Sequence, residues 1–204
     1  MTVEARPLTL QRGLRIEYVG LAYNVVEAGI GVAAGLAAAS VALFGFGLDA
    51  VVEASSSLVI IWRLSVERSG SSTSEEVEHK AIRFVAIAFF ALAAYIAVNS
   101  VVDLVRGNRP DESTVGIVLA VVSLMVMPWL ARRKRKIAAE LHSGSMLADS
   151  KQTELCTYLS AVLLVGLVAN AVAGWWWADP VAGLGIAYFA ANEGRELWIT
   201  DDLC

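Results

Sequence analysis

The sequence predicts an all-α membrane protein that folds as a six-transmembrane-helix bundle. Of its 204 residues, 57% are hydrophobic and 18% are charged, whereas soluble domains contain about 45–50% apolar and about 25% charged residues. The apolar residues gather into runs close to 20 residues long, the length that crosses a hydrocarbon core about 30 Å thick. The runs are continuous rather than alternating. Because lipid permits only helices or closed barrels, we expect helices.

Six apolar runs follow one another along the chain. The first comes directly after a polar N-terminus in which no cleavable signal peptide is visible. The fifth is long enough to begin in an interfacial turn. The sixth starts with three tryptophans, which are typical of the outer membrane interface. The predicted spans are 17–38, 41–62, 82–105, 114–131, 146–174 and 175–192. The whole chain, 1–204, is therefore expected to be a single transmembrane domain without a C-terminal cytoplasmic domain.

The first and last spans carry residues with a structural interpretation. Gly29, Gly31 and Gly35 form a small-residue face on the first span, which favours close approach of another helix. Asp179 is predicted to cap the sixth helix, with Pro180 at its first position. Asn24 and Glu27 are polar residues of the same first span. They either line a cation path or hydrogen-bond a neighbouring helix.

Positive charge is distributed unevenly among the connections. Basic residues concentrate in the N-terminal tail, in the connection between spans 2 and 3, and in the ARRKRK segment that ends at Lys136. The connections between spans 1 and 2 and between spans 5 and 6 contain no Lys or Arg. The positive-inside rule then places both termini in the cytoplasm of a multi-pass protein of the cell or inner membrane. The ARRKRK segment alternatively binds anionic lipid.

Composition and motifs exclude several other classes of function. The net charge of −4 and the isoelectric point near 5.2 give no indication of a nucleic-acid partner. Two cysteines, Cys156 and Cys204, provide no disulfide framework. Neither H-E-x-x-H nor G-x-S-x-G occurs in the sequence, so we do not expect an enzyme.

Polar side chains inside the second and fifth spans predict a metal site. Asp49 and Glu53 are four residues apart, and Asp149, Gln152 and Cys156 are three and then four apart. Both spacings place the side chains on one helix face. An ionisable group inside a membrane costs on the order of 2.5–3.5 kcal/mol. Two such groups on one face suggest that a bound cation offsets the cost.

The chemistry of these residues indicates exchange of a cation for protons. Two ionised carboxylates repel each other, so the pair is either partly protonated or metal-bound, and a metal displaces protons from its ligands. If spans 2 and 5 pack together, Cys156 adds a thiolate, and Asp149 or Gln152 completes the four ligands that zinc favours. An all-oxygen site would instead suit manganese or magnesium. The alternatives are a helix-cap role for the carboxylates and a small buried hydrophobe for the cysteine.

The order of these motifs resembles the cation diffusion facilitator, or cation efflux, family. Its pattern for the first two spans has an Asn, a Gly and then S-x-A-L-L-A-D-A before paired metal-binding residues. This sequence matches it at Asn24, Gly35, Ser40, Ala42 and Leu43, with Phe46 in place of an Asp and with Asp49 and Glu53 at the metal positions. The sixth span matches D-P-x-x-x-L-x-I at Asp179, Pro180, Leu184 and Ile186.

The fifth span departs from the family's A-D-x-x-H-x-x-x-D pattern. Here it reads ADSKQTELC, so Asp149 matches, Gln152 stands at the His and Cys156 at the final Asp. The pattern is most similar to the short zinc-binding branch typified by vertebrate transmembrane protein 163. The resemblance implies a homodimer that exports divalent cations, Zn²⁺ first, in exchange for protons. The altered fifth span keeps an alternative open, a non-transporting zinc-binding membrane protein that modulates a partner transporter.

Overall fold

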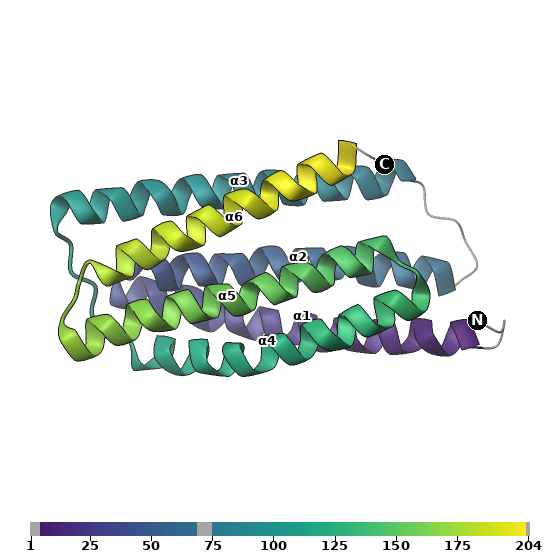
Figure 1. Cartoon of the computed structure of the whole chain (residues 1–204), viewed down its shortest axis with the longest axis horizontal. Coiled ribbons are helices and arrows are strands. Elements are labelled where there is room, and N and C mark those ends of the chain that lie inside the picture. Colours follow the sequence, from purple (N-terminus) through teal and green to yellow (C-terminus); the bar gives the residue numbers. More distant parts are fainter. Residues whose placement is uncertain (1–4, 69–74, 203–204) are drawn as a thin grey trace.

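The computed structural model describes residues 5–68 and 75–202, which are almost entirely helical (Figure 1). The helices are α1 (Ala5–Ala38), α2 (Val41–Arg68), α3 (Glu75–Arg106), α4 (Thr114–Leu141), α5 (Gly144–Ala173) and α6 (Ala178–Asp202). Their number and order confirm the predicted six-helix bundle. Several helices extend beyond the predicted spans at one end of the bundle, because their backbone hydrogen bonds continue into segments with polar side chains.

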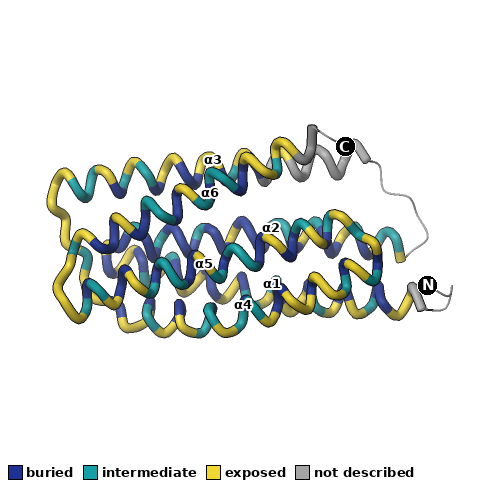
Figure 2. The backbone as a smooth tube through the Cα atoms, viewed as in Figure 1, coloured by how far each residue is buried: buried dark blue, intermediate teal, exposed yellow. Residues whose placement is uncertain are grey.

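The helices run lengthwise and pack most extensively as three pairs: α1 with α2, α3 with α6, and α4 with α5. Figure 1 shows α3 and α6 side by side above the other four helices, and the start of α1 and the end of α6 at the same end of the bundle. Buried positions face the interior, whereas α3 is exposed along its outer side (Figure 2). The interior of the four-helix group, α1, α2, α4 and α5, is where the predicted site residues fall.

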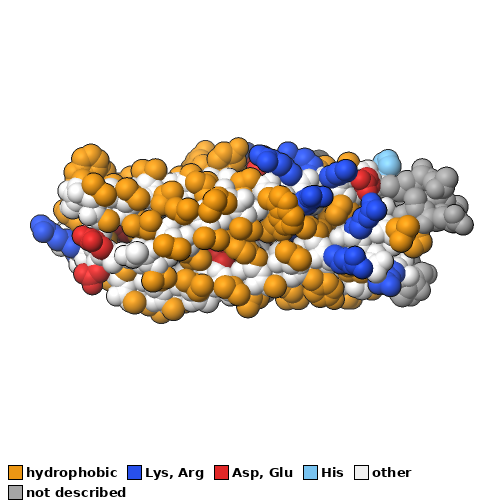
Figure 3. Space-filling view, turned by 90° about the horizontal axis from the view of Figure 1, so that it is seen from below, with side chains coloured by type: hydrophobic (Ala, Val, Ile, Leu, Met, Phe, Trp, Pro, Cys, Tyr) orange, Lys and Arg blue, Asp and Glu red, His pale blue; other side chains and the backbone are white. Residues whose placement is uncertain are grey.

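Five of the described helices, α1 to α5, are long and apolar enough to cross a membrane. Figure 3 shows hydrophobic side chains along one face and Lys and Arg side chains gathered toward the end at which the termini lie, with fewer at the opposite end. The helix α6 begins at Ala178 rather than at the predicted residue 175. Trp175, Trp176 and Trp177 belong to the turn that follows Gly174, whose φ is +65°.

The backbones of α1 and α2 are in direct contact through glycine, as the small-residue face predicts. A Cβ atom added at Gly31 would lie 2.8 Å from the Cα of Gly47, and one added at Gly35 would lie 2.5 Å from the backbone nitrogen of Phe44. Gly29 differs from these, because a Cβ atom there would meet no described atom within 4 Å. Close contact of α1 with α2 therefore depends on Gly31, Gly35 and Gly47.

Asp179 acts on α2 rather than on its own helix, so the predicted capping of α6 is wrong. Its carboxylate accepts a hydrogen bond from the Ser40 hydroxyl at 2.5 Å and one from the backbone nitrogen of Ala42 at 3.5 Å. Ser40 in turn accepts from the backbone nitrogen of Leu43 at 3.0 Å, which is the geometry of an N-cap. Asp179 thus joins α6 to the start of α2 and fixes the depth at which the polar face of α2 lies.

We expect Gly47→Ala to destabilise the bundle and Gly29→Ala to leave it intact. The new methyl at position 47 would lie 2.5 Å from the backbone nitrogen of Val32, and overpacking of this kind costs about 1–3 kcal/mol. The methyl at position 29 would meet open space. Thermal unfolding in detergent should give a lower midpoint for Gly47→Ala alone. Equal midpoints for the two variants would contradict the close packing of α1 on α2.

Candidate metal centre

All five predicted site residues are buried: Asp49, Glu53, Asp149, Gln152 and Cys156, each at most 7% exposed. Asp49 and Glu53 lie one turn apart on the face of α2 that turns inward, and the other three line one face of α5. The two helices pack on each other, so the predicted meeting of their polar faces occurs. The five side chains nevertheless fall into different surroundings.

Asp49 and Glu53 of α2 lie near Cys156 of α5 in the interior of the bundle. The Cys156 thiol interacts with the carboxyl groups of both Asp49 and Glu53. Thr153, one turn away on α5, donates a hydrogen bond of 2.7 Å to Oε1 of Glu53. The second oxygen, Oε2, is buried and has no hydrogen-bond partner among the described residues. This cluster offers two carboxyl groups and a thiol as candidate ligands, and Oε2 of Glu53 has no competing hydrogen bond among the described residues.

The cluster is open rather than closed around an ion. Among the residues that the structure describes, no three His, Cys, Asp or Glu side chains are close enough as they stand to hold a metal ion. Carboxylates that share a low-dielectric interior repel when ionised. Binding of a divalent cation would therefore require the side chains of Asp49, Glu53 and Cys156 to converge on it.

Asp149 lies in a different arrangement, an ion cluster with Lys134 and Glu17. The Lys134 ammonium is 2.6 Å from Oδ2 of Asp149 and 3.2 Å from Oε2 of Glu17, and all three side chains are at most 1% exposed. Ser56 donates a further hydrogen bond of 3.2 Å to Asp149. The cluster joins α1, α2, α4 and α5.

Gln152 lies between Asp149 and Cys156 in the sequence of α5, and its side chain is buried. Its Nε2 atom has no hydrogen-bond partner within the described part of the chain. The structure thus places Cys156 near Asp49 and Glu53, pairs Asp149 with an ammonium, and leaves Nε2 of Gln152 without a partner among the described residues.

Lys134 is a buried charged residue beside the candidate site that the sequence pattern does not reveal. It falls within ARRKRK, which indicates a solvated basic segment, yet it is completely buried. Its neighbours behave as expected: Arg135 pairs with Glu154 at the surface, and Arg133 lies over the Trp129 ring. The available signal was the helical register, because the buried face of α4 continues through Met127, Leu130, Lys134, Ala138 and Leu141.

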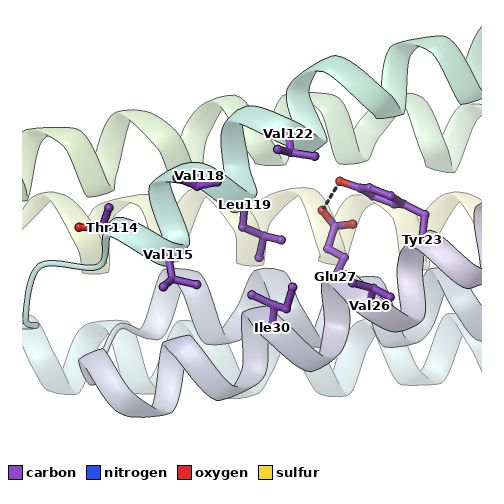
Figure 4. A pocket seen from close by; sticks show the side chains of 9 residues that line it. All are labelled: Tyr23, Val26, Glu27, Ile30, Thr114, Val115, Val118, Leu119 and Val122. Atoms are coloured by element: carbon purple, nitrogen blue, oxygen red, sulfur yellow. Dashed lines mark hydrogen bonds between the residues drawn. The ribbon is translucent and has the colours of Figure 1, made fainter.

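On α1, Glu27 and Asn24 also face the interior, each 1% exposed. The Tyr23 hydroxyl donates a hydrogen bond of 3.3 Å to Oε1 of Glu27. Tyr23 and Glu27 border a pocket of about 370 Å³ between α1 and α4 (Figure 4). Apart from Tyr23, Glu27 and Thr114, the lining is aliphatic: Val26, Ile30, Val115, Val118, Leu119 and Val122.

The interior as a whole holds more acidic groups than basic ones. The buried carboxyl groups around the four-helix interior belong to Glu17, Glu27, Asp49, Glu53 and Asp149, and among the described residues Lys134 is the one buried Lys or Arg. A set of uncompensated anions in a low-dielectric interior is unstable. Protons or an additional cation must balance the charge, which is the property required of a site that exchanges one for the other.

Comparison with known proteins identifies relatives of this chain. The chain is 28% identical over 168 residues to an uncharacterised transporter of Synechocystis, which covers 78% of this chain and 53% of the relative. It is 24% identical to the magnetosome protein MamB of Magnetospira over 88% of this chain and 61% of the relative. It is 29% identical to the cation-efflux pump FieF of Shewanella oneidensis over 46% of this chain and 31% of the relative.

The chain therefore spans about half to three fifths of the length of the first two of these relatives. The family described as the cation efflux transmembrane domain matches residues 18–200, a range that includes α2, α4, α5 and every predicted site residue. On this match, the chain belongs to the cation efflux transmembrane domain family.

Proposed function

We propose that the protein transports divalent metal cations across the membrane in exchange for protons, with Zn²⁺ as the preferred cation. The observation that carries the proposal is the meeting of Asp49 and Glu53 of α2 with Cys156 of α5 inside the bundle. Family membership and relatives named as transporters support cation movement. The identity of the ion and the counter-ion rest on the chemistry of the side chains.

The ligand set favours zinc over magnesium. Zinc accepts sulfur, nitrogen and oxygen ligands in four-coordinate sites, whereas magnesium prefers oxygen alone. Cys156 is buried beside both carboxyl groups, so ionisation of its thiol in this interior requires a nearby cation. Binding of zinc would draw the thiolate and the two carboxylates together and release the protons that they carry. We take this release as the physical basis of antiport.

The ion cluster of Lys134 closes the interior toward the end at which the chain termini lie. Lys134 bridges Glu17 of α1 and Asp149 of α5, so a cation entering from that end meets an ammonium first. We propose that access from this end requires Lys134 to move away from Asp149. The distribution of basic residues supports a cytoplasmic location of this end, and hence export, in the orientation that the positive-inside rule predicts. A homodimer formed through membrane helices completes the proposal.

A second function is favoured by a specific observation, the open geometry of the site. Gln152 and Cys156 stand where the family pattern has His and Asp, and no three candidate ligands in the described residues are gathered closely enough to bind an ion. A site altered in this way suits a zinc-binding membrane protein that modulates a partner transporter. Binding of zinc without its movement across the membrane would select this function.

Asp49→Asn should weaken zinc binding by at least about tenfold, because even residues that only support metal ligands account for losses of 10–100-fold. Isothermal titration of the detergent-solubilised protein measures the affinity. Glu154→Gln is the control, since that carboxylate lies at the surface and pairs with Arg135. Unchanged affinity in Asp49→Asn would contradict a zinc site on α2.

Proteoliposomes with an internal zinc dye and an imposed pH gradient test transport itself. We expect zinc uptake that depends on the gradient in the unaltered protein and is lost in Glu53→Gln, because the amide cannot exchange a proton. Equal uptake in Glu53→Gln would contradict the role of this carboxyl group. Retained zinc binding without any uptake by the unaltered protein would select the modulator function.

Lys134→Met should destabilise the fold by about 3–5 kcal/mol, since removal of one partner leaves buried charges uncompensated. Lys136→Met, two residues away and exposed, should have little effect. Adding Asp149→Asn to Lys134→Met should recover part of the stability, because one stranded carboxylate is removed. Thermal unfolding in detergent compares the variants, and equal midpoints for Lys134→Met and Lys136→Met would refute the buried ion cluster.

A further inference from the structure

We propose that Glu27 of α1 is a direct ligand of the transported cation and completes, with Asp49, Glu53 and Cys156, a site that α2 and α5 leave one ligand short. The inference rests on the proposed function, because it assumes that a cation binds at Asp49 and Glu53. It adds a third helix to a site that the sequence motifs confine to two.

The site needs a fourth ligand that α5 does not supply. Zinc is held by four groups in closed sites, and α2 with Cys156 accounts for three. Asp149 is held by the Lys134 ammonium at 2.6 Å, so its charge is already compensated. Gln152 offers a neutral amide, a weak ligand beside carboxylates. A further anionic group facing Asp49 and Glu53 would meet the requirement.

Glu27 is a buried residue whose carboxyl group lies in electrostatic range of both carboxyl groups of α2. Its carboxyl group interacts electrostatically with those of Glu53 and Asp49 and with the thiol of Cys156. It is 1% exposed, and only Oε1 accepts the hydrogen bond from Tyr23. The other oxygen, Oε2, is buried without a hydrogen-bond partner in the described part of the chain. A buried acceptor left without a partner is unfavourable, and coordination of a cation would offset this cost.

Hydroxyl groups link Glu27 to the turn of α5 that carries Cys156. Ser123 of α4 interacts with the carboxyl group of Glu27. Ser160 of α5 donates hydrogen bonds to the Ser123 hydroxyl at 3.0 Å and to the backbone oxygen of Cys156 at 2.7 Å. These contacts hold α1, α4 and α5 at one level of the bundle. Glu27 therefore lies at the depth of Cys156, where an ion bound by the thiol would sit.

The surroundings of Glu27 on its other side offer no substitute for a cation. Figure 4 shows its carboxyl group between α1 and α4, bordered by Ile30, Leu119 and Val122. In a membrane, such an aliphatic pocket provides no charge to compensate an ionised carboxylate. The group is stable when it carries a proton or contacts a cation, and it alternates between the two as the ion arrives and leaves.

A third carboxylate ligand would affect which divalent metals the site prefers. Three oxygen donors and one sulfur accept zinc and also suit divalent manganese or iron better than a sulfur-rich site would. Replacement of Glu27 by another ligand type should therefore change the preference among metals as well as the affinity. A purely structural side chain would not produce such a change.

Isothermal titration with zinc and with manganese tests the assignment in the detergent-solubilised full chain. We expect Glu27→Gln to weaken zinc binding at least about tenfold. Glu154→Gln is the control, because Glu154 lies at the surface, where it pairs with Arg135; it should retain the affinity of the unaltered protein. Glu27→Gln with unchanged zinc affinity would overturn the inference, even if proton coupling were lost.

A second variant keeps the test decisive if Glu27→Gln does not fold. Glu27→His supplies an imidazole, which zinc accepts and manganese accepts less well, so the ratio of zinc to manganese affinity should rise at least about tenfold. An unchanged ratio would overturn the inference. If Asp49→Asn abolishes binding while both Glu27 variants behave as the unaltered protein, the inference fails and the proposed function stands. If the unaltered protein binds neither metal, both fail.

Discussion

The structure depends on an imbalance of charge in its interior. Carboxyl groups from α1, α2 and α5 share a low-dielectric space with the ammonium of Lys134. Such an interior is stable only when protons or a further cation make up the difference. The same constraint that makes the fold possible therefore makes it responsive to both species. Lys134 offsets one of the two negative charges that Glu17 and Asp149 would carry, and we propose that the remaining carboxyl groups bind an exchangeable cation.

The packing of the helices determines where this imbalance lies. Direct backbone contact between α1 and α2 through Gly31, Gly35 and Gly47 brings Glu27 to the level of Asp49 and Glu53. The bond from Asp179 to Ser40 fixes the start of α2, and hence the depth of its polar face. The pairing of α4 with α5 brings Lys134 to Asp149 and Ser123 to Ser160. Small residues and caps thus position charges that belong to four different helices.

Periodicity in the sequence predicts the face on which a side chain lies, and this was sufficient for the six helices and for the inward orientation of Asp49, Glu53 and Cys156. It does not predict the partner across the interface. Asp149 is on the expected face but contacts an ammonium, Asp179 caps α2 instead of α6, and Lys134 is concealed in a segment whose composition indicates solvent. The role of Glu27 was open for the same reason, because a polar residue on a buried helix face serves equally as a ligand or as a hydrogen-bond partner. The structure shows that Oε1 of Glu27 accepts a hydrogen bond from Tyr23, while Oε2 has no partner among the described residues.

Central to this account is obligatory exchange of cation for protons at a shared set of carboxyl groups. The most direct measurement follows the pH inside proteoliposomes when zinc is added outside, with no pH gradient imposed and with the membrane potential clamped. Our account predicts that zinc entering the lumen drives protons out, so the internal pH rises in step with the zinc signal and returns when the zinc gradient is collapsed. Zinc entry without any change of internal pH would contradict it.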